Sequence, residues 1–512
     1  MNETIVNITN ITKDGKNTIT FLELLFYIFG FLYFFSFIDK NKPESRKHSF
    51  LTEKKALKIT NKSQSQSKKI DMYLKNIIGL ETVKEEIRYY MDFINNKDKY
   101  KKWNVKLPKG ILLAGPPGTG KTLLVKTMAE SLDIPIVNVS GSEFVEVYVG
   151  VGASRIRELF ERAKKHKKCI IFIDEIDAIG KKRGCDNNSE RDNTLNQLLV
   201  EMNGFDDNDN IMVFAATNMV RKLDRALIRS GRFDKKIYFD PPNFKERKQL
   251  FQLYLKNIDY SQDLTLDILA ERTAGLTGAD IASACNQAKI NAIQNNKKIY
   301  SLNENDIQKA IDEIMIGREK RERTMNDQEI ERVAHHEAGH AIIGYLLKNC
   351  SPPVKVSVVP RGEAALGFSQ QKSDDKKLLT EEMILSKIAV LLGGRSAEKV
   401  IYGNYSTGAQ DDIEKLTRLA INYCGIWGLN KNIGPINTQI YYEYGEKIQN
   451  ITFNESQKLI LNIEKWVIKT LKKYKRFIIS IAKELITNET IDSNTIEKIL
   501  PSSSLDSEEI QL

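Results

Sequence analysis

Cysteine is scarce in this sequence, and the cysteines that occur lie far apart. The 512 residues contain 5 cysteines, none of them in a C-x-x-C pair: Cys169, Cys185, Cys285, Cys350 and Cys424. An odd number of scattered cysteines argues against a disulfide framework and against a thiolate metal site. We therefore expect the main body of the chain to lie in a reducing compartment.

A strong charge of one sign is also lacking. Lys and Arg number 77 against 67 Asp and Glu, which leaves a net charge of +10 in a chain that is 28% charged. No dense basic block with interleaved aromatic residues occurs, so the sequence predicts no nucleic-acid binding. With 58.5 kDa, the chain is long enough for two or three domains.

A long hydrophobic run lies near the N-terminus. Residues 19–38, ITFLELLFYIFGFLYFFSFI, contain a single charged residue, Glu23. As a helix with a rise of ~1.5 Å per residue, this run spans the ~30 Å core of a bilayer. A cleaved signal peptide would have a shorter apolar region followed by small residues, whereas the first alanine is Ala56. The run therefore predicts a permanent transmembrane helix.

The basic residues around this run predict its orientation. Lys13 and Lys16 precede it, and a larger set follows: Lys40, Lys42, Arg46, Lys47, Lys54, Lys55 and Lys58. By the positive-inside rule, residues 1–18 form a short external N-terminus and everything after residue 38 is cytoplasmic. We expect a single-pass protein of a bacterial plasma membrane, with an organelle inner membrane as the alternative. The polar residues 39–70 are typical of a flexible linker.

From residue 71 onward, short apolar runs alternate with amphipathic stretches. The runs begin at five positions: Ile111, Ile134, Cys169, Ile211 and Lys236. Such alternation predicts an α/β subdomain with a parallel sheet over residues 71–242, in which ligands bind at the carboxyl ends of the strands. Residues 243–317 have a helical pattern.

The first of these runs leads into GPPGTGKT, which matches G-x-x-x-x-G-K-[ST] between a strand and a helix. Backbone N–H groups of such a loop surround phosphate oxygens, Lys121 is expected at the β and γ phosphates of ATP, and Thr122 is expected to bind Mg²⁺. A glycine-rich turn without a ligand is the alternative. The predicted binding loop consists of Gly115, Pro116, Pro117, Gly118, Thr119, Gly120, Lys121 and Thr122.

Two later strands end in polar residues that suit the same chemistry. In IIFIDEID, Asp174 and Glu175 close a strand; Asp174 is predicted to hold Mg²⁺ through water, and Glu175 to activate the attacking water. In AATN, Asn218 is placed to sense the γ phosphate. Acidic residues at a strand end can also be helix caps, and an isolated asparagine can be a turn residue.

With these motifs, the sequence resembles the AAA+ ATPases. The stretch LDRALIRSGRFD carries Arg229 and Arg232, although Ser230 stands where that family usually has proline. By composition alone two such arginines would be surface residues. The resemblance implies that they reach the nucleotide of a neighbouring subunit in a ring, usually a homohexamer. It also implies an adenine-binding role for Ile78, Gly79, Gly278 and Ala279, and a helical lid over residues 243–317.

Between the phosphate loop and the acidic pair lies a further resemblance to this family. Tyr148, Val149 and Gly150 resemble the pore loop that grips a translocating polypeptide. A tyrosine that packs on a neighbouring residue is the plain alternative.

Three of the five histidines are crowded into AHHEAGH, residues 334–340. His336, Glu337 and His340 satisfy H-E-x-x-H on a strongly helical stretch, and the i, i+4 spacing puts both imidazoles on one face. This pattern predicts a zinc site in which Glu337 takes a proton from the water at the metal. His335 does not share this geometry; it either supports the site from outside the ligand set or lies on the surface.

A catalytic zinc site needs a third protein ligand. Residues 406–420, STGAQDDIEKLTRLA, resemble the segment that supplies an aspartate in the membrane-anchored FtsH-type metalloproteases of the AAA+ group. The match indicates Asp412, but Asp411 stands where that family commonly has asparagine, so either carboxylate remains a candidate. Glu398 is a competing acid, interpreted as a residue outside the ligand set or in an ion pair. Residues 325–500 are thus predicted to be a mainly α-helical zinc metallopeptidase domain, and residues 501–512 a polar tail.

The resemblance implies an ATP-dependent, processive zinc metalloendopeptidase. It would bind one Zn²⁺ per subunit, ATP and Mg²⁺, assemble as a homohexamer, and degrade membrane proteins and short-lived soluble proteins. The alternative is an ATP-driven, membrane-tethered unfoldase or chaperone whose protease site is inactive.

Overall fold

The structure of the chain is a computed structural model. It describes residues 66–96, 100, 102–103, 105, 108–146, 148, 150–181, 189–204, 211–256, 258–260, 265–294, 301–319, 325–361, 367–371, 378–438 and 446–500. The predicted external N-terminus, the transmembrane helix at 19–38, most of the predicted linker and the tail at 501–512 lie outside these residues. Among the helices that are described, none combines the length and the apolar character needed to cross a bilayer.

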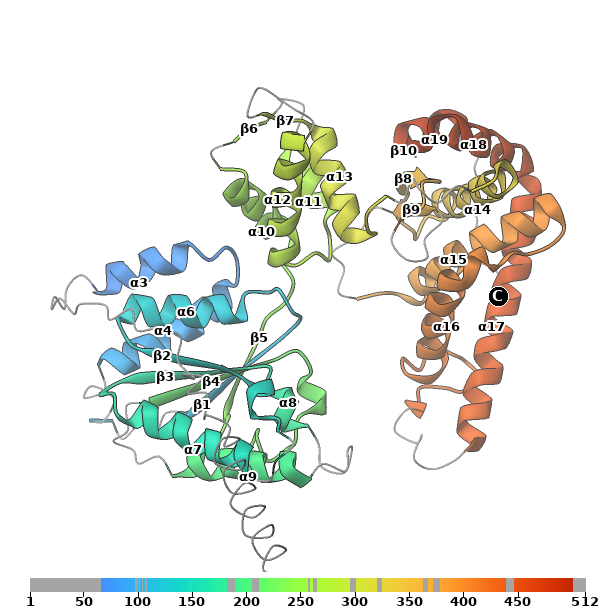
Figure 1. Cartoon of the computed structure of the whole chain (residues 1–512). Coiled ribbons are helices and arrows are strands. Elements are labelled where there is room, and N and C mark those ends of the chain that lie inside the picture. The colour runs from blue at the N-terminus through green and yellow to red at the C-terminus, as the bar shows by residue number, and fades with distance from the viewer. Residues whose placement is uncertain are drawn as a thin grey trace, which may run out of the picture.

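The first part of the described chain is an α/β subdomain built on a five-stranded parallel sheet (Figure 1). Its strands are β1 (Gly110–Ala114), β2 (Ile136–Ser140), β3 (Cys169–Asp174), β4 (Ile211–Thr217) and β5 (Lys235–Tyr238). Each begins within two residues of a predicted apolar run. The spatial order β2-β3-β4-β1-β5 puts β4 between β3 and β1. The predicted parallel sheet is thereby confirmed.

Helices cover both faces of this sheet (Figure 1). On one face lie α3 (Gln66–Lys75), α4 (Glu81–Asn95) and α6 (Lys121–Leu132); on the other lie α7 (Val151–Lys164), α8 (Asp177–Gly180) and α9 (Ser189–Asn203). Successive strand residues point to opposite faces, so Ile111 and Leu113 join the core under the first group while Leu112 joins the core under the second. Burial on both faces explains why the inner strands β1, β3 and β4 are continuous apolar runs.

The prediction of a flexible linker up to residue 70 is wrong at its end. Helix α3 begins at Gln66, and Leu74 on this helix is 1% exposed in the core beside α6. Ile70, one turn earlier, packs against the same core. Two apolar side chains at i, i+4 thus place one face of α3 against the core of the subdomain.

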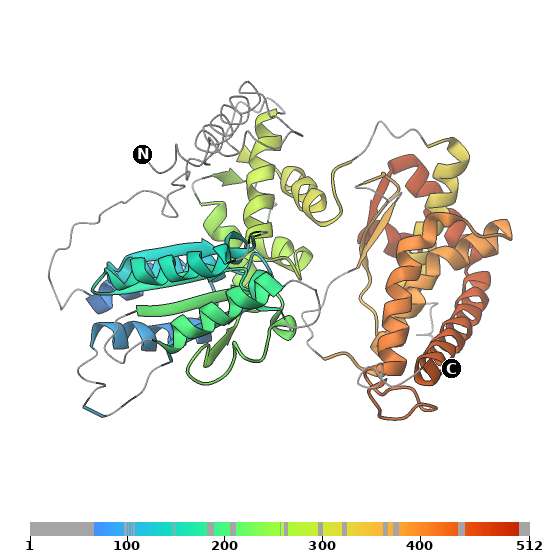
Figure 2. The same ribbon diagram turned by 60° about the horizontal axis from the view of Figure 1, so that its bottom comes forward.

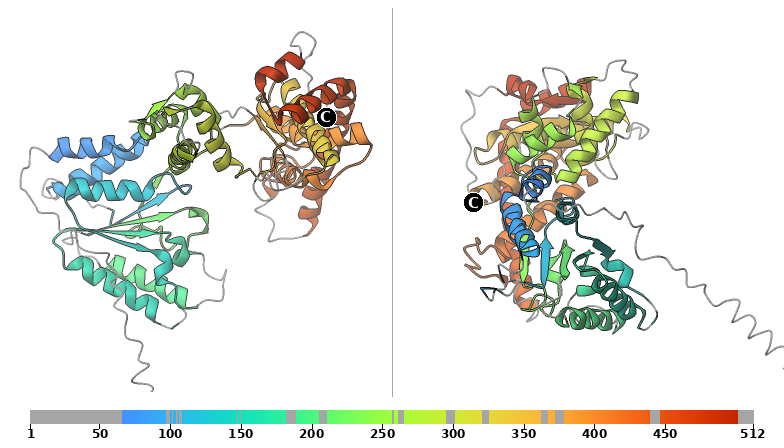
Figure 3. Two further views of the ribbon diagram at one scale, coloured as in Figure 1. Left: turned by 45° about the horizontal axis from the view of Figure 1, so that its top comes forward. Right: turned by 90° about the vertical axis from the view of Figure 1, so that its left-hand side faces the viewer.

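The predicted helical lid follows as a separate small bundle. It contains α10 (Phe244–Tyr254), α11 (Leu266–Arg272), α12 (Gly278–Gln294) and α13 (Glu304–Met315), with two short paired strands, β6 (Asp259–Tyr260) and β7 (Ser301–Leu302). The helices share a core of their own that includes Phe251, Ile281 and Ile307. The lid lies between the α/β subdomain and the C-terminal domain (Figure 2; Figure 3, left).

The C-terminal domain is mainly helical, as predicted. Its helices are α14 (Asp327–Leu346), α15 (Glu381–Tyr402), α16 (Gln410–Gly425), α17 (Glu446–Lys473), α18 (Lys475–Asn488) and α19 (Ser493–Ile499). Ile463, Val467 and Leu471 are fully buried on α17, so this long helix packs against the core of the domain. Sequence reasoning missed a small antiparallel sheet of β8 (Pro353–Ser357), β9 (Phe368–Gln371) and β10 (Thr490–Asp492).

A buried cluster of charges joins the lid to this domain. Asp312 on α13 lies 2.5 Å from the Lys355 ammonium on β8 and 3.7 Å from the Arg361 guanidinium, which also pairs with Glu319 at 2.8 Å. The Asp312 and Arg361 side chains are 6% and 4% exposed. Buried charges tolerate such burial only when they are paired, so this contact fixes the end of α13 against β8.

Candidate functional site

The strand order brings the first set of predicted residues together. Parallel strands end at the same edge of a sheet, and β4 lies between β1 and β3. The Lys121 ammonium donates to Asn218 Oδ1 at 2.9 Å, and the Thr122 hydroxyl donates to Asp174 Oδ2 at 2.8 Å. Side chains at or after the ends of β1, β3 and β4 thus form hydrogen bonds with one another at this edge of the sheet.

Lys121 also donates to the loop itself. Its ammonium lies 2.8 Å from the Gly115 carbonyl oxygen and 2.7 Å from that of Pro116. Burial lowers the pKa of Lys121, and the nearby carboxylates of Asp174 and Asp177 oppose that shift. Helix α6 begins immediately at Lys121, and its N-cap residue, Gly120, provides no side-chain cap. A helix N-terminus without a side-chain cap is suited to bind a phosphate group.

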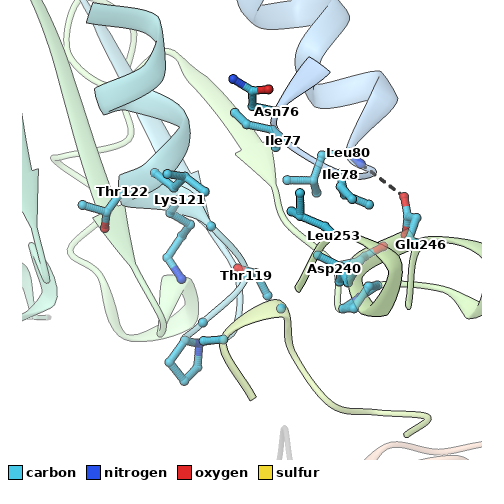
Figure 4. A pocket seen from close by; sticks show the side chains of 18 of the residues that line it. Asn76, Ile77, Ile78, Leu80, Thr119, Lys121, Thr122, Asp240, Glu246 and Leu253 are labelled. Carbon is cyan, nitrogen blue, oxygen red and sulfur yellow. Dashed lines mark hydrogen bonds between the residues drawn. The ribbon is translucent and has the colours of Figure 1, made fainter. Parts of the chain in front are cut away.

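A cavity of about 450 Å³ opens beside this helix terminus (Figure 4). This volume suits a cofactor-sized ligand. Of the predicted nucleotide-binding residues, the following line it: Ile78, Pro117, Gly118, Thr119, Gly120, Lys121, Thr122, Asp174, Glu175, Asn218, Gly278 and Ala279. Gly79, Gly115 and Pro116 are not among the lining residues; Gly115 and Pro116 instead offer their carbonyl oxygens to Lys121.

The rest of the cavity wall comes mainly from the chain before α4, from the residues after β5 and from the lid. Asn76 and Ile77 belong to segment 76–79, which resembles an adenine-binding segment, whereas sequence reasoning missed a further set: Leu80, Asp240, Pro242, Glu246, Leu250, Leu253 and Tyr254. Glu246 accepts a hydrogen bond from the Leu80 N–H at 3.2 Å and so connects the chain before α4 to the lid (Figure 4). The Ala279 N–H donates to the Gly118 carbonyl at 3.2 Å, which closes the lid on the phosphate loop.

Backbone strain is concentrated at this cavity. In the described part of the chain, four residues other than glycine have positive φ, and two of these, Leu80 (58°) and Glu175 (50°), line the cavity. Left-handed backbone is unfavourable for such residues and clusters at functional sites. The Glu175 side chain is exposed at the end of β3, and its N–H donates to Asp174 Oδ1 at 3.0 Å.

The two predicted arginines lie away from this cavity. Arg229 is exposed, and Arg232 donates to the Ala226 carbonyl at 2.6 Å; neither lines the cavity of its own chain. Tyr148 also lies away from the cavity, with 76% of its surface exposed. Gly150 has φ of 83° at the start of α7, and Val149 lies outside the described residues.

A second set of predicted residues meets in the C-terminal domain. His336 and His340 lie one turn apart on α14, and Asp412 comes from the first turn of α16. Asp412 Oδ2 lies 3.3 Å from His336 Nε2 and 3.1 Å from His340 Nε2. The three potential ligand atoms lie within 4.8 Å of one another.

Hydrogen bonds on the far side of each ring hold both imidazoles in place. His336 Nδ1 lies 2.8 Å from Glu398 Oε1, and His340 Nδ1 lies 2.7 Å from the Val390 carbonyl oxygen. Such partners orient the other ring nitrogen toward a common point. Glu398 therefore contacts the outer nitrogen of His336, and it also pairs with Arg332 at 3.4 Å.

The structure shows which of the two adjacent aspartates, and which of the neighbouring histidines, belong to the cluster. Asp411 lies outside the cluster in an exposed ion pair with Lys415 at 2.6 Å. His335 is 5% exposed, so the interpretation as a surface residue is wrong. Its Nδ1 lies 2.9 Å from the Tyr402 hydroxyl, and it contributes no atom to the cluster.

The electrostatics of the cluster favour charged groups despite their burial. Burial alone would lower the pKa of His336, but hydrogen bonds with Asp412 and Glu398 outweigh it and raise the pKa to about 10. Burial opposes the charged form of Asp412 as well, yet the two imidazoles hold its pKa well below the usual range. Asp412 therefore remains ionised, and once a divalent cation displaces the protons of the two imidazoles, the carboxylate and both ring nitrogens form its donor set.

Further features of the cluster fit zinc. Two nitrogens and one carboxylate oxygen leave a fourth position open, as in catalytic zinc sites. Glu337 is 6% exposed, and its Oε2 atom has no hydrogen-bond partner among the described residues. Buried polar atoms require a partner, and a water molecule at the cluster would supply it. Burial raises the pKa of Glu337, while His340 and His336 oppose the shift.

Glycines at the contact between α14 and α15 allow the two helices to pack closely beside the cluster of Asp412 and the two histidines. A Cβ atom on Gly394 of α15 would lie 2.2 Å from His336 Nε2, and one on Gly339 of α14 would lie 2.4 Å from the Gly393 carbonyl oxygen. Helices α14 and α15 can therefore approach each other this closely only because residues 339 and 394 have no side chains. Neither glycine carried a recognisable signal in the sequence.

Asp412 and Asp411 allow a matched test of the metal site. Asp412→Ala is expected to lower zinc affinity by more than about 100-fold, because the loss of outer partners alone lowers affinity by about 10–100-fold. Asp411→Ala is expected to retain zinc. Metal content per subunit after dialysis, measured by mass spectrometry of the purified variants, checks both. Zinc retained by Asp412→Ala and lost by Asp411→Ala would contradict the assignment.

The fold and the two sites define a protein class: an AAA-type ATPase module with a helical lid, joined to a metallopeptidase domain. Comparison with known families agrees. Residues 111–241 match the ATPase family associated with various cellular activities, residues 263–309 match the AAA+ lid domain, and residues 323–499 match peptidase family M41.

Comparison with individual relatives identifies the family within this class of proteins. It is 40% identical over 440 residues to the ATP-dependent zinc metalloprotease FtsH of Rhodothermus marinus and 41% identical over 445 residues to that of Chlorobium luteolum. It is 40% identical over 438 residues to FtsH 2 of a Thermoanaerobacter species. These alignments cover 83%, 83% and 86% of this chain, and 63%, 62% and 84% of the relatives. The chain belongs to the FtsH family of ATP-dependent zinc metalloproteases, and it spans less than two thirds of the length of the first two relatives.

Proposed function

We propose that this protein is a processive zinc metalloendopeptidase that uses ATP to unfold, translocate and degrade polypeptides. The observation that carries the proposal is the presence of both sites in one chain: the Lys121 cavity and the His336, His340 and Asp412 cluster. A zinc site within an assembly cannot reach the peptide bonds of a folded substrate. Hydrolysis of ATP supplies the work of unfolding that substrate.

In the ATPase site, the chain's own residues bind and orient the nucleotide. The phosphates would lie on the N–H groups at the start of α6, and Lys121 would leave the loop carbonyls to bind the β and γ phosphates. Thr122 and Asp174, already 2.8 Å apart, would hold Mg²⁺, which neutralises the developing charge. Glu175 would orient and deprotonate the attacking water, and Asn218 would contact the γ phosphate. Ile78, Gly278 and Ala279, which line the cavity, would surround the adenine, whereas Gly79, next to Ile78, lies outside the cavity wall.

In the peptidase site, His336, His340 and Asp412 would hold one zinc ion per subunit. When bound, zinc polarises the substrate carbonyl and acidifies a water molecule. Glu337 would accept the proton of that water at its unpartnered Oε2 atom and later donate it to the leaving amine. Glu398 would keep His336 in the tautomer that presents Nε2 inward.

Arg229, Arg232 and the Tyr148 loop suggest a ring. Both arginines lie away from the cavity of their own chain, so we propose that they contact the nucleotide of a neighbouring subunit in a homohexamer. The aromatic ring of Tyr148 is exposed and would grip the backbone and side chains of a substrate in the central channel, together with Val149 and Gly150. Aromatic contact area depends little on sequence, which suits an unfolded chain as the substrate.

Casein degradation by the purified, detergent-solubilised protein tests the proposal. We expect cleavage with ATP, Mg²⁺ and Zn²⁺, and loss of cleavage when ATP is omitted or the metal is removed with 1,10-phenanthroline. Restoring zinc after removal of the chelator is expected to restore cleavage. ATP hydrolysis without cleavage in every sample would support the inactive-protease alternative instead.

We also propose that residues 19–38 anchor the enzyme to a bacterial plasma membrane, or alternatively to an organelle inner membrane, as a single span. The ATPase module at 71–242, the lid at 243–317 and the peptidase domain at 325–500 would then face the cytoplasm and act on membrane proteins and short-lived soluble proteins. The full chain is expected to remain in the membrane fraction after extraction at pH 11, whereas a chain lacking residues 1–38 is expected to be soluble. Release of the full chain by the alkaline wash would count against the anchor.

A further inference from the structure

Helix α7 begins directly after the Tyr148 loop without a cap of its own. Its N-cap residue is Gly150, which has no side chain, and its third residue is Ala153, which cannot bond back to the N-cap N–H. A capping box would normally fill both roles. Other helices of this chain have complete boxes, including α10 with Asn243 and Glu246.

Glu190 on the neighbouring helix α9 supplies the missing partner. The Gly150 N–H donates to Glu190 Oε1 at 2.7 Å, although the two residues are 40 positions apart. Glu190 is 6% exposed, so this charge-assisted hydrogen bond is shielded from water. The carboxylate also lies in the first turn of α9, where the helix dipole favours a negative charge.

The packing around this bond leaves little room for adjustment. A Cβ atom on Gly152 of α7 would lie 2.4 Å from Thr194 Oγ1 on α9 and 2.5 Å from the Phe144 carbonyl oxygen. Thr194 is fully buried. The start of α7 is thus in direct contact with the first two turns of α9, and the C-terminal end of the Tyr148 loop is fixed to α9.

The other end of the loop contacts the proposed hydrolysis site. The loop follows the short helix η1 (Gly141–Phe144), and a Cβ atom on Gly141 would lie 2.4 Å from the carbonyl oxygen of Glu175. Arg155 on α7 donates to the Glu143 carbonyl and pairs with Glu146, which joins the two ends of the loop. A backbone shift at Glu175 would therefore move η1 while Glu190 holds Gly150.

We propose that Glu190 is a positioning residue for the Tyr148 loop: by capping α7 from α9, it fixes one end of the loop so that movement at Glu175 swings Tyr148. The inference rests on the proposed translocating function of this loop. Glu190 itself would touch neither nucleotide nor substrate. It would instead affect how much polypeptide is moved for each ATP molecule hydrolysed.

Three variants of the full chain test this role. Glu190→Ala removes the acceptor, Glu190→Gln retains an oxygen that can accept the same N–H, and Asp192→Ala removes an acidic side chain from the same turn of α9. For Glu190→Ala we expect degradation of a stably folded protein substrate to fall about threefold to tenfold, as for the loss of a helix cap. Basal ATP hydrolysis and cleavage of a short fluorogenic peptide are expected to stay at the wild-type level. Glu190→Gln and Asp192→Ala are expected to resemble the wild type.

Two readouts separate this role from general damage. The ATP consumed per substrate molecule degraded is expected to rise in Glu190→Ala, and hydrogen exchange at the Gly150 amide to become faster in Glu190→Ala alone. Wild-type rates of degradation and exchange in Glu190→Ala would overturn the proposal, as would a joint loss of ATP hydrolysis and peptide cleavage. A wild-type protein that hydrolyses ATP but never degrades casein would instead remove the proposed function, and the exchange measurement would still decide whether Glu190 caps α7.

Discussion

Replacing Glu337 by glutamine is expected to stop peptide-bond cleavage while ATP hydrolysis continues. The substitution keeps the shape of the side chain but removes the group that accepts the proton, and the loss of a general base lowers rates by about 10²–10⁴-fold. Glu337 is buried next to both histidines but contributes no atom to the ligand cluster, so zinc content is expected to remain unchanged. Casein cleavage, ATP turnover and bound zinc, measured on one preparation, check the three statements together.

Glu331→Gln is the matched control for this variant, because Glu331 is exposed on the same helix α14. It is expected to cleave casein at the wild-type rate. Unchanged proteolysis in Glu337→Gln would show that the metal cluster is not the site of cleavage and would favour the unfoldase alternative. A loss of zinc in Glu337→Gln would mean that this side chain supports the cluster structurally.

Lys121→Ala is expected to have the reverse effect: ATP hydrolysis falls while cleavage of short peptides continues. Lys121 is the cation at the start of α6 that joins the loop to Asn218, and its removal takes away charge stabilisation worth about 10²-fold or more in rate. ATP hydrolysis and degradation of folded proteins are expected to fall together. A short peptide needs no unfolding, so its cleavage at the zinc site is expected to persist. Phosphate release and fluorogenic peptide cleavage measure the two activities separately.

Lys126→Ala controls for the loss of a lysine from α6, since Lys126 is exposed on the same helix. It is expected to hydrolyse ATP normally. If Lys121→Ala continued to degrade a folded substrate at the wild-type rate, ATP hydrolysis in this cavity would not drive unfolding. Peptide cleavage lost along with ATP hydrolysis would show that nucleotide binding is needed to form the peptidase site.

The two sites differ in how far the sequence could predict them. The loop from Gly115 to Thr122 was predictable because its chemistry depends on contiguous backbone between a strand and a helix. His336 and His340 were likewise predictable, since helical geometry alone places residues i and i+4 on one face. The third member of the cluster is different: Asp411 and Asp412 are both in the first turn of α16, and only the packing of α16 against α15 and α17 brings Asp412, and not Asp411, to the histidines of α14.

Local periodicity and short motifs therefore determined the parallel sheet, the helical lid and peptidase domain, the phosphate loop and the histidine pair. Each depends on hydrogen bonds or side-chain directions that repeat within a few residues. Tertiary structure alone decided what depends on contacts between distant segments: the cavity wall from Glu246 and Leu253, the contact of Glu398 with His336, the close approach at Gly394, and the bond from Gly150 to Glu190. These contacts arise because packed helices and strands bring side chains together at distances that no spacing along the chain encodes.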